Sequence, residues 1–222
     1  MLARYATRFN ATEINSSFYR SHQQKTYARW AESVPGDFRF SVKLPKTISH
    51  DLRLQACAGL LDGFMEEIQG LGNKLAGILV QLPPSLSFDG RTASTFFAML
   101  RRRTEVAVAC EPRHSSWFDP KPDALFQRYS VNRIGADPAL NAQAAQPGAH
   151  GRWRYWRWHG SPCIYYSDYP DDALLQLSES VRSSWRQRAM PWVIFDNTAH
   201  GHALANAARL QELLSAPAPV QR

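Results

Sequence analysis

The sequence predicts an α/β protein in which about seven parallel strands and their outer helices form an incomplete TIM-type βα barrel. Short apolar runs typical of buried strands alternate along the chain with stretches that have the apolar spacing of helices. The connections between them are short, as in parallel βα units. No expected strand leads into a Gly-x-Gly-x-x-Gly turn or a Walker-type loop, so the nucleotide-binding open sheets lack their usual signature. Together these observations favour a barrel over a doubly wound sheet.

The expected strands are apolar runs that end in polar residues, and they cover residues 11–18, 38–44, 75–81, 105–111, 130–137, 154–159 and 191–197. The expected helices carry apolar residues at three- and four-residue spacing and cover residues 22–33, 51–71, 92–103, 123–129, 171–188 and 203–214. Residues 140–151, rich in Ala, Gln and Gly, predict a surface loop. We therefore expect a single domain over residues 1–215 and a flexible tail at 216–222.

The strand at residues 105–111 is the most informative element, because its pattern runs directly into chemically reactive side chains. Side chains alternate across a strand, so Val106, Val108 and Cys110 share one face while Glu111 shares the other with two alanines. Pro112 cannot donate to the ladder and ends the strand. The loop that follows holds Arg113, His114 and Trp117. In α/β proteins such a loop usually faces a ligand.

The same alternation in the other strands predicts a ring of polar side chains in the barrel interior, near the carboxyl ends. Helices cover the outside of a barrel, so the bulky apolar faces should point outward and the polar faces inward. The residues collected in this way are Glu13, Asn15, Lys43, Gln81, Glu111, Asp137, Arg157 and His159. In the last strand either Asp196 or Asn197 could face inward. Buried charges are costly unless they are paired, so these residues must bind each other, water or a ligand.

Two readings of this ring stay open at the level of sequence. In the structural reading, Glu13 with Lys43 and Glu111 with Arg157 are ion pairs, and His159 is a satisfied core histidine. In the functional reading, so many polar groups at one end of a barrel indicate a site, since aliphatic residues would fill a core better. Gly160, next to His159, would then let a ligand approach an acid/base group or metal ligand closely.

The amino-acid composition indicates the cellular compartment and the kind of binding partner that we expect. The net charge of +7 indicates an acidic partner only weakly, because most of the charge is arginine scattered along expected helices, where it is usually solvated. Three cysteines without metal-ligand spacing leave an odd thiol, which favours a reducing cytoplasm. No apolar run approaches the roughly 18 residues of a membrane helix, so no membrane association is expected. A small anionic ligand or a nucleic acid is the partner that the charge allows.

The polar motifs resemble those of a known family. They are Phe9-Asn-Ala-Thr-Glu-Ile-Asn-Ser-Ser-Phe-Tyr19, Phe40-Ser-Val-Lys-Leu-Pro45, Gln81-Leu-Pro-Pro84, Glu111-Pro-Arg-His-Ser-Ser-Trp117, Ala136-Asp137, Arg157-Trp-His-Gly160 and Phe195-Asp-Asn-Thr198. In this order, over nearly the whole chain, they are similar to the YecE-like family, domain of unknown function 72. The resemblance implies a TIM-type barrel and no particular reaction. Its likeness to the endonuclease IV and xylose isomerase barrels is one of fold alone.

The resemblance also implies a departure at the start of the chain. Family members open with a strand and loop of the form Gly-x-Ser-Gly-Trp-x-Tyr, which this sequence lacks before the helix expected at residues 2–8. A barrel of seven strands should therefore have a gap between the strands at residues 11–18 and 191–197, unless those two close directly. Any family function that uses the absent loop would be lost.

Two classes of function compete. The first is an enzyme acting on a phosphorylated or sugar-like anion, with Glu111, His159, Asp137 and Glu13 as catalytic candidates. Its ligand-binding candidates are Asn15, Tyr19, Lys43, Gln81, Arg113, His114, Trp117, Arg157, Gly160, Asp196 and Asn197. In it, Arg113 and Arg157 clamp the anion, and Trp117 or Tyr19 offers a stacking surface. The second is a noncatalytic binder of nucleic acid or a phospholigand.

Neither a cofactor nor a metal is expected. Acidic residues and His159 could in principle bind a divalent ion, but Lys43 and Arg157 on the same wall would repel it. Phosphate in TIM-type barrels often binds the loops after the last two strands, next to the start of a helix. Here those loops are residues 159–162 and 197–201.

Overall fold

The computed structural model describes residues 2–149 and 151–216. The chain divides into two compact units, Met1–Arg133 and Ile134–Arg222. The tail expected at 216–222 falls, apart from residue 216, outside the described residues. Whether residues 1–215 behave as a single domain stays a prediction.

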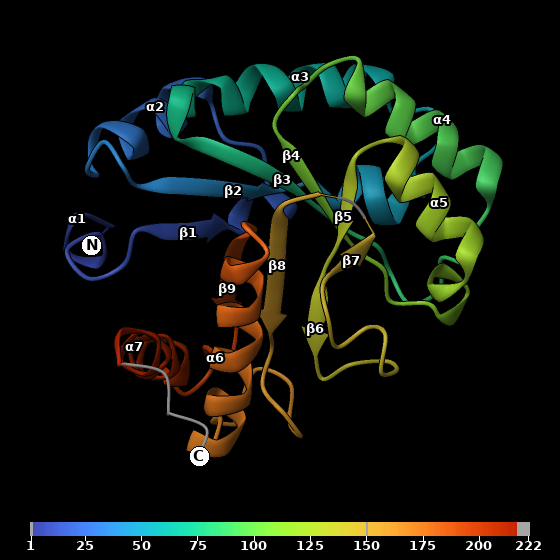
Figure 1. Ribbon diagram of the computed structural model, residues 1–222. Helices are drawn as coiled ribbons and strands as arrows, with labels where there is room; N and C mark the ends of the chain where they lie inside the picture. The colour runs from blue at the N-terminus through green and yellow to red at the C-terminus, as the bar shows by residue number, and fades with distance from the viewer. Residues whose placement is uncertain (1, 150, 217–222) are drawn as a thin grey trace. The chain divides into compact units, whose positions relative to one another are not determined.

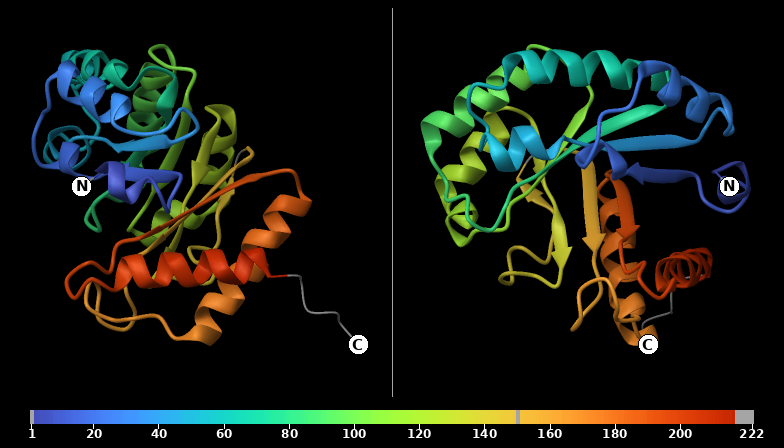
Figure 2. Two further views of the ribbon diagram at one scale, coloured as in Figure 1. Left: turned by 90° about the vertical axis from the view of Figure 1, so that its left-hand side faces the viewer. Right: turned by 180° about the vertical axis from the view of Figure 1, so that it is seen from behind.

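The first unit holds a parallel sheet whose strands follow one another in chain order. They are β1 (Ala11–Ile14), β2 (Arg39–Lys43), β3 (Leu75–Gln81), β4 (Ala107–Glu111) and β5 (Val131–Arg133). Its helices are α1 (Leu2–Tyr5), α2 (Gln24–Glu32), α3 (Ala58–Ile68), α4 (Gly90–Arg101) and α5 (Pro120–Arg128). The helices from α2 to α5 lie along one side of this sheet (Figures 1 and 2). Shorter helical turns cover Ser16–Phe18, Thr47–Asp51, Gln69–Lys74 and Ser115–Phe118.

The strand register confirms the predicted alternation in this sheet. An aliphatic row crosses all five strands and consists of Ile14, Val42, Ile78, Val108 and Val131. All five are buried, and each contributes about 1.5–3 kcal/mol of hydrophobic stabilisation. Lys43 pairs in register with Leu79, and Gln81 pairs with Glu111. By strand parity these polar side chains lie on the opposite face from the aliphatic row.

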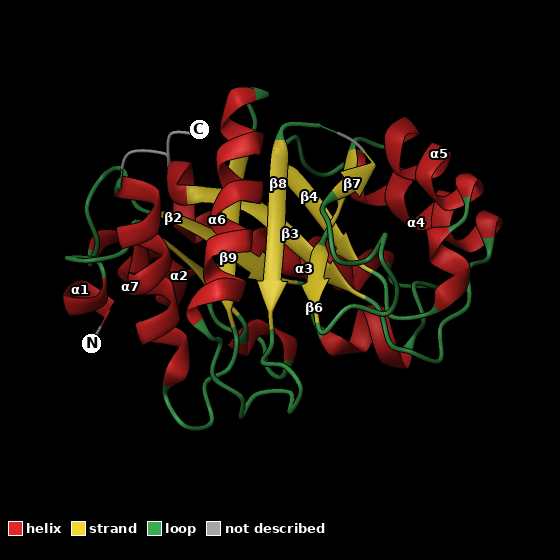
Figure 3. Ribbon diagram, turned by 60° about the horizontal axis from the view of Figure 1, so that its bottom comes forward, coloured by secondary structure: helices red, strands yellow, loops and turns green. Residues whose placement is uncertain are grey.

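The second unit is built on a three-stranded parallel sheet. Its strands, in spatial order, are β6 (Gly135–Asp137), β8 (Trp153–Trp158) and β9 (Met190–Phe195). The short strand β7 (Gly148–Ala149) is not part of this sheet. The helices α6 (Asp171–Arg186) and α7 (His202–Ser215) pack against each other and against β9 (Figure 3). The core between these elements consists of Trp156, Tyr169, Leu174, Leu177, Val181, Phe195, Ala203 and Leu210.

Three predicted elements have different bounds in the structure. The strand expected at residues 130–137 is two strands, β5 and β6, separated by Ile134. At Gly135 the chain runs so close to Ala145 and Pro147 that a Cβ would lie 2.8 Å from the Ala145 carbonyl oxygen. The backbone N–H of Ala136 donates to the Ala144 carbonyl, so part of the expected surface loop packs beside β6.

The other two differences occur where loops leave strands. The strand expected at 11–18 ends at Ile14, because Asn15 adopts a helical conformation and begins the 3₁₀ turn Ser16–Phe18. The helix expected at 51–71 begins only at Ala58. A π-helical turn, Thr47–Asp51, and three residues with positive φ precede it, namely Arg53, Leu54 and Ala56. Among the described residues the strands form separate sheets, so a closed barrel is not confirmed.

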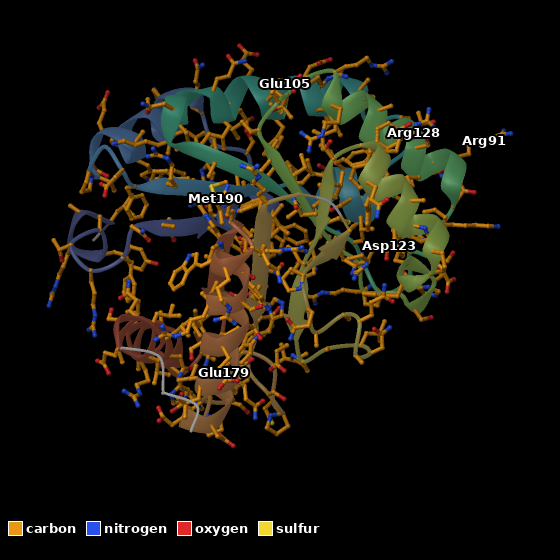
Figure 4. All side chains as sticks on the ribbon, in the orientation of Figure 1. Arg91, Glu105, Asp123, Arg128, Glu179 and Met190 are labelled. Carbon is orange, nitrogen blue, oxygen red and sulfur yellow. The ribbon has the colours of Figure 1, made fainter. Side chains whose placement is uncertain are left out.

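Several arginine side chains either bond to other groups of the protein or extend into solvent. Arg101 donates to the backbone carbonyls of Tyr129, Val106 and Ser130, and Arg103 pairs with Asp62 at 2.7 Å. Figure 4 shows the side chains of Arg91 and Arg128 at the periphery, on the helical side of the first unit. In the part of the chain that the structure describes, no helix combines the length and the apolarity needed to cross a bilayer.

Candidate functional site

Glu111 and Arg113 form a charged pair at the carboxyl end of β4. The guanidinium of Arg113 donates to a single carboxylate oxygen, Oε1 of Glu111, from Nε at 3.0 Å and from Nη2 at 2.8 Å. Pro112 ends the strand between them and turns the chain so that both side chains meet. Glu111 is 2% exposed, whereas the Arg113 side chain is 27% exposed. The pair therefore buries its carboxylate and presents its cation toward solvent.

Lys43 lies at the end of β2, over an aromatic ring. Its Nζ is 4.0 Å from the centroid of the Phe18 ring, a cation–π contact, and the residue is 5% exposed. The hydroxyl of Ser17 donates to the Lys43 carbonyl at 2.6 Å, which ties the turn after β1 to β2. The parallel pairing of β1 with β2, together with this hydrogen bond, holds Phe18 beside Lys43.

His50 joins this group, although the sequence did not single it out. Its ring meets the Phe18 ring edge to face at 4.9 Å, and its Nδ1 is 2.9 Å from the Ser49 hydroxyl. Burial lowers the pKa of His50, and the charges of Lys43, Arg113 and Lys46 lower it further, against the opposing charge of Asp51. His50 follows β2 by only a few residues, so its place on a loop after a strand was the signal that could have identified it.

Other predicted residues of the first unit surround this group. Tyr19 is 75% exposed, and its ring lies 5.0 Å from that of Phe18. Gln81 is buried and pairs in register with Glu111, while Glu13 is half-buried and pairs with Ser41. Within the described residues, the amide oxygen of Asn15 is buried without a hydrogen-bond partner.

Two residues that were predicted to bind a ligand make structural contacts in the first unit. Trp117 is 1% exposed, stacks on Phe126 at 5.8 Å, and donates from Nε1 to the Leu86 carbonyl at 2.8 Å. It cannot offer a stacking surface to a ligand, because core residues cover its ring. His114 begins the 3₁₀ turn Ser115–Phe118, where its Nδ1 accepts from the backbone N–H of Ser116 at 3.2 Å. Ligand binding by His114, which is half-buried, stays a prediction.

In the second unit, Arg157, His159 and Asp196 come together at the carboxyl ends of β8 and β9. Nδ1 of His159 lies 3.3 Å from Oδ2 of Asp196, and Nη2 of Arg157 lies 3.4 Å from the same oxygen. Arg157 Nη1 is 3.4 Å from Nε2 of His159. Parallel pairing aligns Arg157 with Ile194, which brings these strand ends side by side. Asp196, rather than Asn197, is thus the neighbour of His159 in this cluster.

Asp137 and Gly160 are linked through Tyr169, which the sequence analysis missed. The Tyr169 hydroxyl donates to Oδ2 of Asp137 at 2.6 Å and accepts from the backbone N–H of Gly160 at 2.8 Å. Burial, followed by the hydrogen bond to Asp137, raises the pKa of Tyr169. Gly160 has φ 98°, which glycine adopts readily. The cluster of tyrosines at 165–169 was the available signal for this contact.

Asn197 and the start of α7 are engaged with protein groups. Asn197 is fully buried, and its Nδ2 donates to the Ser167 carbonyl and to Oδ1 of Asn206. At the helix start, Oδ2 of Asp168 lies 3.7 Å from Nδ1 of His202. A carboxylate therefore already lies near the end of the helix where an anion was expected.

No group of three or more His, Cys, Asp or Glu side chains within residues 2–149 and 151–216 has the arrangement of a metal site. The groups described above are instead ion pairs and hydrogen-bonded pairs at strand ends. Side chains of these types are the ones with which proteins bind anions and transfer protons.

Comparisons with known proteins identify relatives of this chain. It is 35% identical over 153 residues to the UPF0759 protein YecE of Escherichia coli K12, a match that covers 66% of this chain and 55% of YecE. The match thus spans little more than half of that relative. It is 25% identical to the UPF0759 protein YunF of Bacillus subtilis, over 96% of this chain and 86% of YunF.

Crystal structures of two DUF72 family proteins have a similar fold. One from Enterococcus faecalis V583 matches with a TM-score of 0.82 at 20% identity, covering 100% of this chain and 92% of that chain. One from Thermotoga maritima MSB8 matches with a TM-score of 0.77 at 23% identity, covering 94% of this chain and 85% of that chain. The family model described as "Protein of unknown function DUF72" matches residues 1–222. The chain therefore belongs to the DUF72 family.

Proposed function

We propose that this chain is an enzyme that acts on a phosphorylated or sugar-like anion at the carboxyl ends of its parallel strands. The observation that supports this most directly is the grouping of Lys43, His50 and Arg113 in the first unit. Lys43 and His50 contact the same Phe18 ring, and the charge of Arg113 acts on His50. Cationic and imidazole donors around one aromatic ring suit an anion attached to a ring or an apolar group.

Each residue of this group has a proposed role. Lys43 and Arg113 bind the anion, and Tyr19, exposed next to Phe18, stacks against the rest of the ligand. Glu111 is the acid/base candidate, since Arg113 holds it in a fixed orientation. Two further polar groups at the same strand ends, Gln81 and Asn15, contribute amide groups, and Glu13 is a second carboxylate candidate.

The second unit supplies its own acid/base candidate, His159. Asp196 accepts at Nδ1 of the imidazole, an arrangement that fixes the ring and its tautomer. Arg157 is the proposed anion clamp of this cluster, and Gly160, whose positive φ shapes the turn beside His159, stays a proposed ligand contact. Asp137, proposed from the sequence as catalytic, acts here through Tyr169 to position Gly160.

The test measures binding of inorganic phosphate and turnover of a panel of sugar phosphates by the full chain. Lys43→Gln should weaken phosphate binding roughly tenfold, because it removes a charge-assisted contact worth about 1.5 kcal/mol. Arg128→Gln, on the exposed surface of α5, is the matched control and should leave binding unchanged. Equal binding by both variants would contradict the proposed anion site.

Turnover should depend on Glu111 and His159 separately. Glu111→Gln and His159→Gln each remove a proton-transfer group, which typically contributes 10²–10⁴-fold to rate. A substrate whose turnover survives both changes would contradict the catalytic assignment. Binding without turnover of any phosphorylated compound would instead favour a noncatalytic binder.

The net charge of +7 supports the second candidate, a noncatalytic binder of nucleic acid or a phospholigand. Arg91, on the outer helix α4, is exposed and could contact phosphates. Binding of this kind weakens steeply as salt rises, because counterions are released. An affinity for nucleic acid that hardly changes with salt concentration would contradict this second candidate function.

We also propose the barrel fold and the cytoplasmic location that were expected from the sequence. The βα order of the seven strands expected from the sequence, together with the family membership, supports an incomplete TIM-type barrel as a single domain over residues 1–215. The three cysteines are free, which supports a reducing cytoplasm.

A further inference from the structure

We infer that His50 is a binding residue of the anion site at Lys43, Phe18 and Arg113, and that it takes up a proton when a phosphate or sulfate group binds there. This inference rests on the proposed function, since it needs the anion site to exist. It adds a titrating group to that site and therefore a dependence of affinity on pH.

The geometry places His50 on the same wall as Lys43. Its ring contacts the Phe18 ring at 4.9 Å, and Nζ of Lys43 is 4.0 Å from the centroid of that ring. The Ser49 hydroxyl donates to the Pro45 carbonyl at 3.4 Å, and its oxygen accepts from Nδ1 of His50 at 2.9 Å. Nε2 is therefore the nitrogen that takes up the proton when the ligand binds. An imidazolium at this position donates to an anion that also contacts the Lys43 ammonium.

The backbone that presents His50 has an unusual conformation. His50 belongs to the π-helical turn Thr47–Asp51, and such turns occur often at functional sites. Arg53, Leu54 and Ala56 follow with φ of 50°, 69° and 47°, a region that is strained for residues other than glycine. The segment is nevertheless held in place, because Ile48 and Ser49 are buried and Arg53 donates to Ser85. A strained turn that fixes one imidazole is consistent with a binding role.

The charges around His50 determine the direction of the proton exchange. Lys43, Lys46 and Arg113 act against protonation and Asp51 favours it, so three cations oppose one anion. Together with burial, they hold the pKa of the empty site below its ordinary value of 6.5. A bound dianion offsets this excess of positive charge and therefore raises that pKa. Between the two pKa values binding takes up a proton, and affinity rises as pH falls through this window.

The test is titration calorimetry of the full chain with sulfate, at several pH values from about 5.5 to about 7.5, in buffers of different ionisation enthalpy. Sulfate carries no proton that exchanges near neutrality, so any net uptake belongs to the protein. The expected result is proton uptake on binding that His50→Gln abolishes. His22→Gln is the matched control, because burial also lowers the pKa of His22 while its ring contacts Tyr27 and Trp30 instead. This control should keep the full uptake.

A second measurement does not depend on how the variants fold. Proton NMR of the His50 ring in the wild-type chain should show its pKa rising when sulfate or phosphate is added. Unchanged uptake in His50→Gln, or an unmoved His50 pKa despite anion binding, would overturn this inference and leave the proposed anion site intact. Failure of both anions to bind would overturn the anion site and the inference together.

Discussion

The hydroxyl of Tyr169 donates a hydrogen bond of 2.6 Å to Oδ2 of Asp137. The same oxygen accepts from the backbone N–H of Gly160, so one phenol connects the end of β6 to the loop after β8. Tyr169 is 6% exposed, which makes both contacts part of the core of the second unit. The turn at Gly160, next to His159, therefore depends on a residue ten positions from His159 in the sequence.

Tyr169→Phe should lower the free energy of unfolding by about 1–3 kcal/mol, because it leaves the Gly160 N–H and the Asp137 carboxylate without this partner. Urea denaturation monitored by tryptophan fluorescence measures the change. Tyr166→Phe is the matched control, since Tyr166 is 56% exposed. Equal stability of the two variants would show that the Tyr169 hydroxyl does not hold the turn.

Glu111→Leu should destabilise the first unit by about 1–3 kcal/mol, because the Arg113 guanidinium loses two charge-assisted hydrogen bonds. The partial exposure of Arg113 keeps this below the 3–5 kcal/mol typical of a fully buried pair. Glu111→Gln retains an acceptor oxygen and should cost less. If thermal melting is unchanged in both variants, the pair has no structural role. The alternative partner predicted from the sequence, Arg157, stays a prediction.

His22→Gln and His50→Gln should reduce the loss of stability in mild acid. Both folded-state pKa values lie below 6.5, so the unfolded chain binds more protons than the folded chain as pH falls from that value. The contribution of the two neutral histidines to the free energy of unfolding is fully present above pH 6.5 and is lost as the pH falls through their folded-state pKa values. Each variant should therefore gain in melting temperature, relative to the wild type, more at about pH 5.5 than at about pH 7.5. A gap between variant and wild type that is the same at both pH values would contradict this.

Gly160→Ala and Gly63→Ala should shift stability in opposite directions. At Gly160, with φ 98°, a Cβ would lie 3.1 Å from the Cys163 carbonyl oxygen and 3.2 Å from Cβ of Asn197. We expect a loss of at least about 1 kcal/mol there. Gly63 lies inside α3 and a Cβ would meet nothing within 4 Å, so alanine should add about 0.5–1 kcal/mol. Melting temperatures of the two variants test both signs.

Thiol labelling of the native chain should be selective for Cys163, which is exposed, whereas Cys57 and Cys110 are buried. Burial raises the pKa of both buried thiols, which keeps them protonated and unreactive. Ellman's reagent should label one thiol rapidly in the native protein and all three after denaturation. Cys163→Ser should remove the rapid reaction, and rapid labelling that survives it would point to local opening around a buried cysteine.

The sequence by itself determined the order and type of the main elements. Alternation in β2, β3 and β4 predicted the face on which Lys43, Gln81 and Glu111 lie, because a two-residue period is a local property of extended chain. Helices α4, α6 and α7 appeared close to their predicted ranges for the same reason, since their apolar spacing is local. The family followed from the polar motifs at the strand ends.

Only the tertiary structure decided which polar groups meet. In the first unit the hydrogen-bond partner seen for Glu111 is Arg113, two residues away in the chain. Trp117 is the last residue of the polar motif that begins at Glu111, yet Phe126 covers its ring. His50 and Tyr169 entered the clusters from loops whose conformations no periodicity encodes. Side-chain pairing depends on loop paths and long-range packing, which are set by contacts between residues far apart in the chain, whereas strand and helix patterns are set by neighbours.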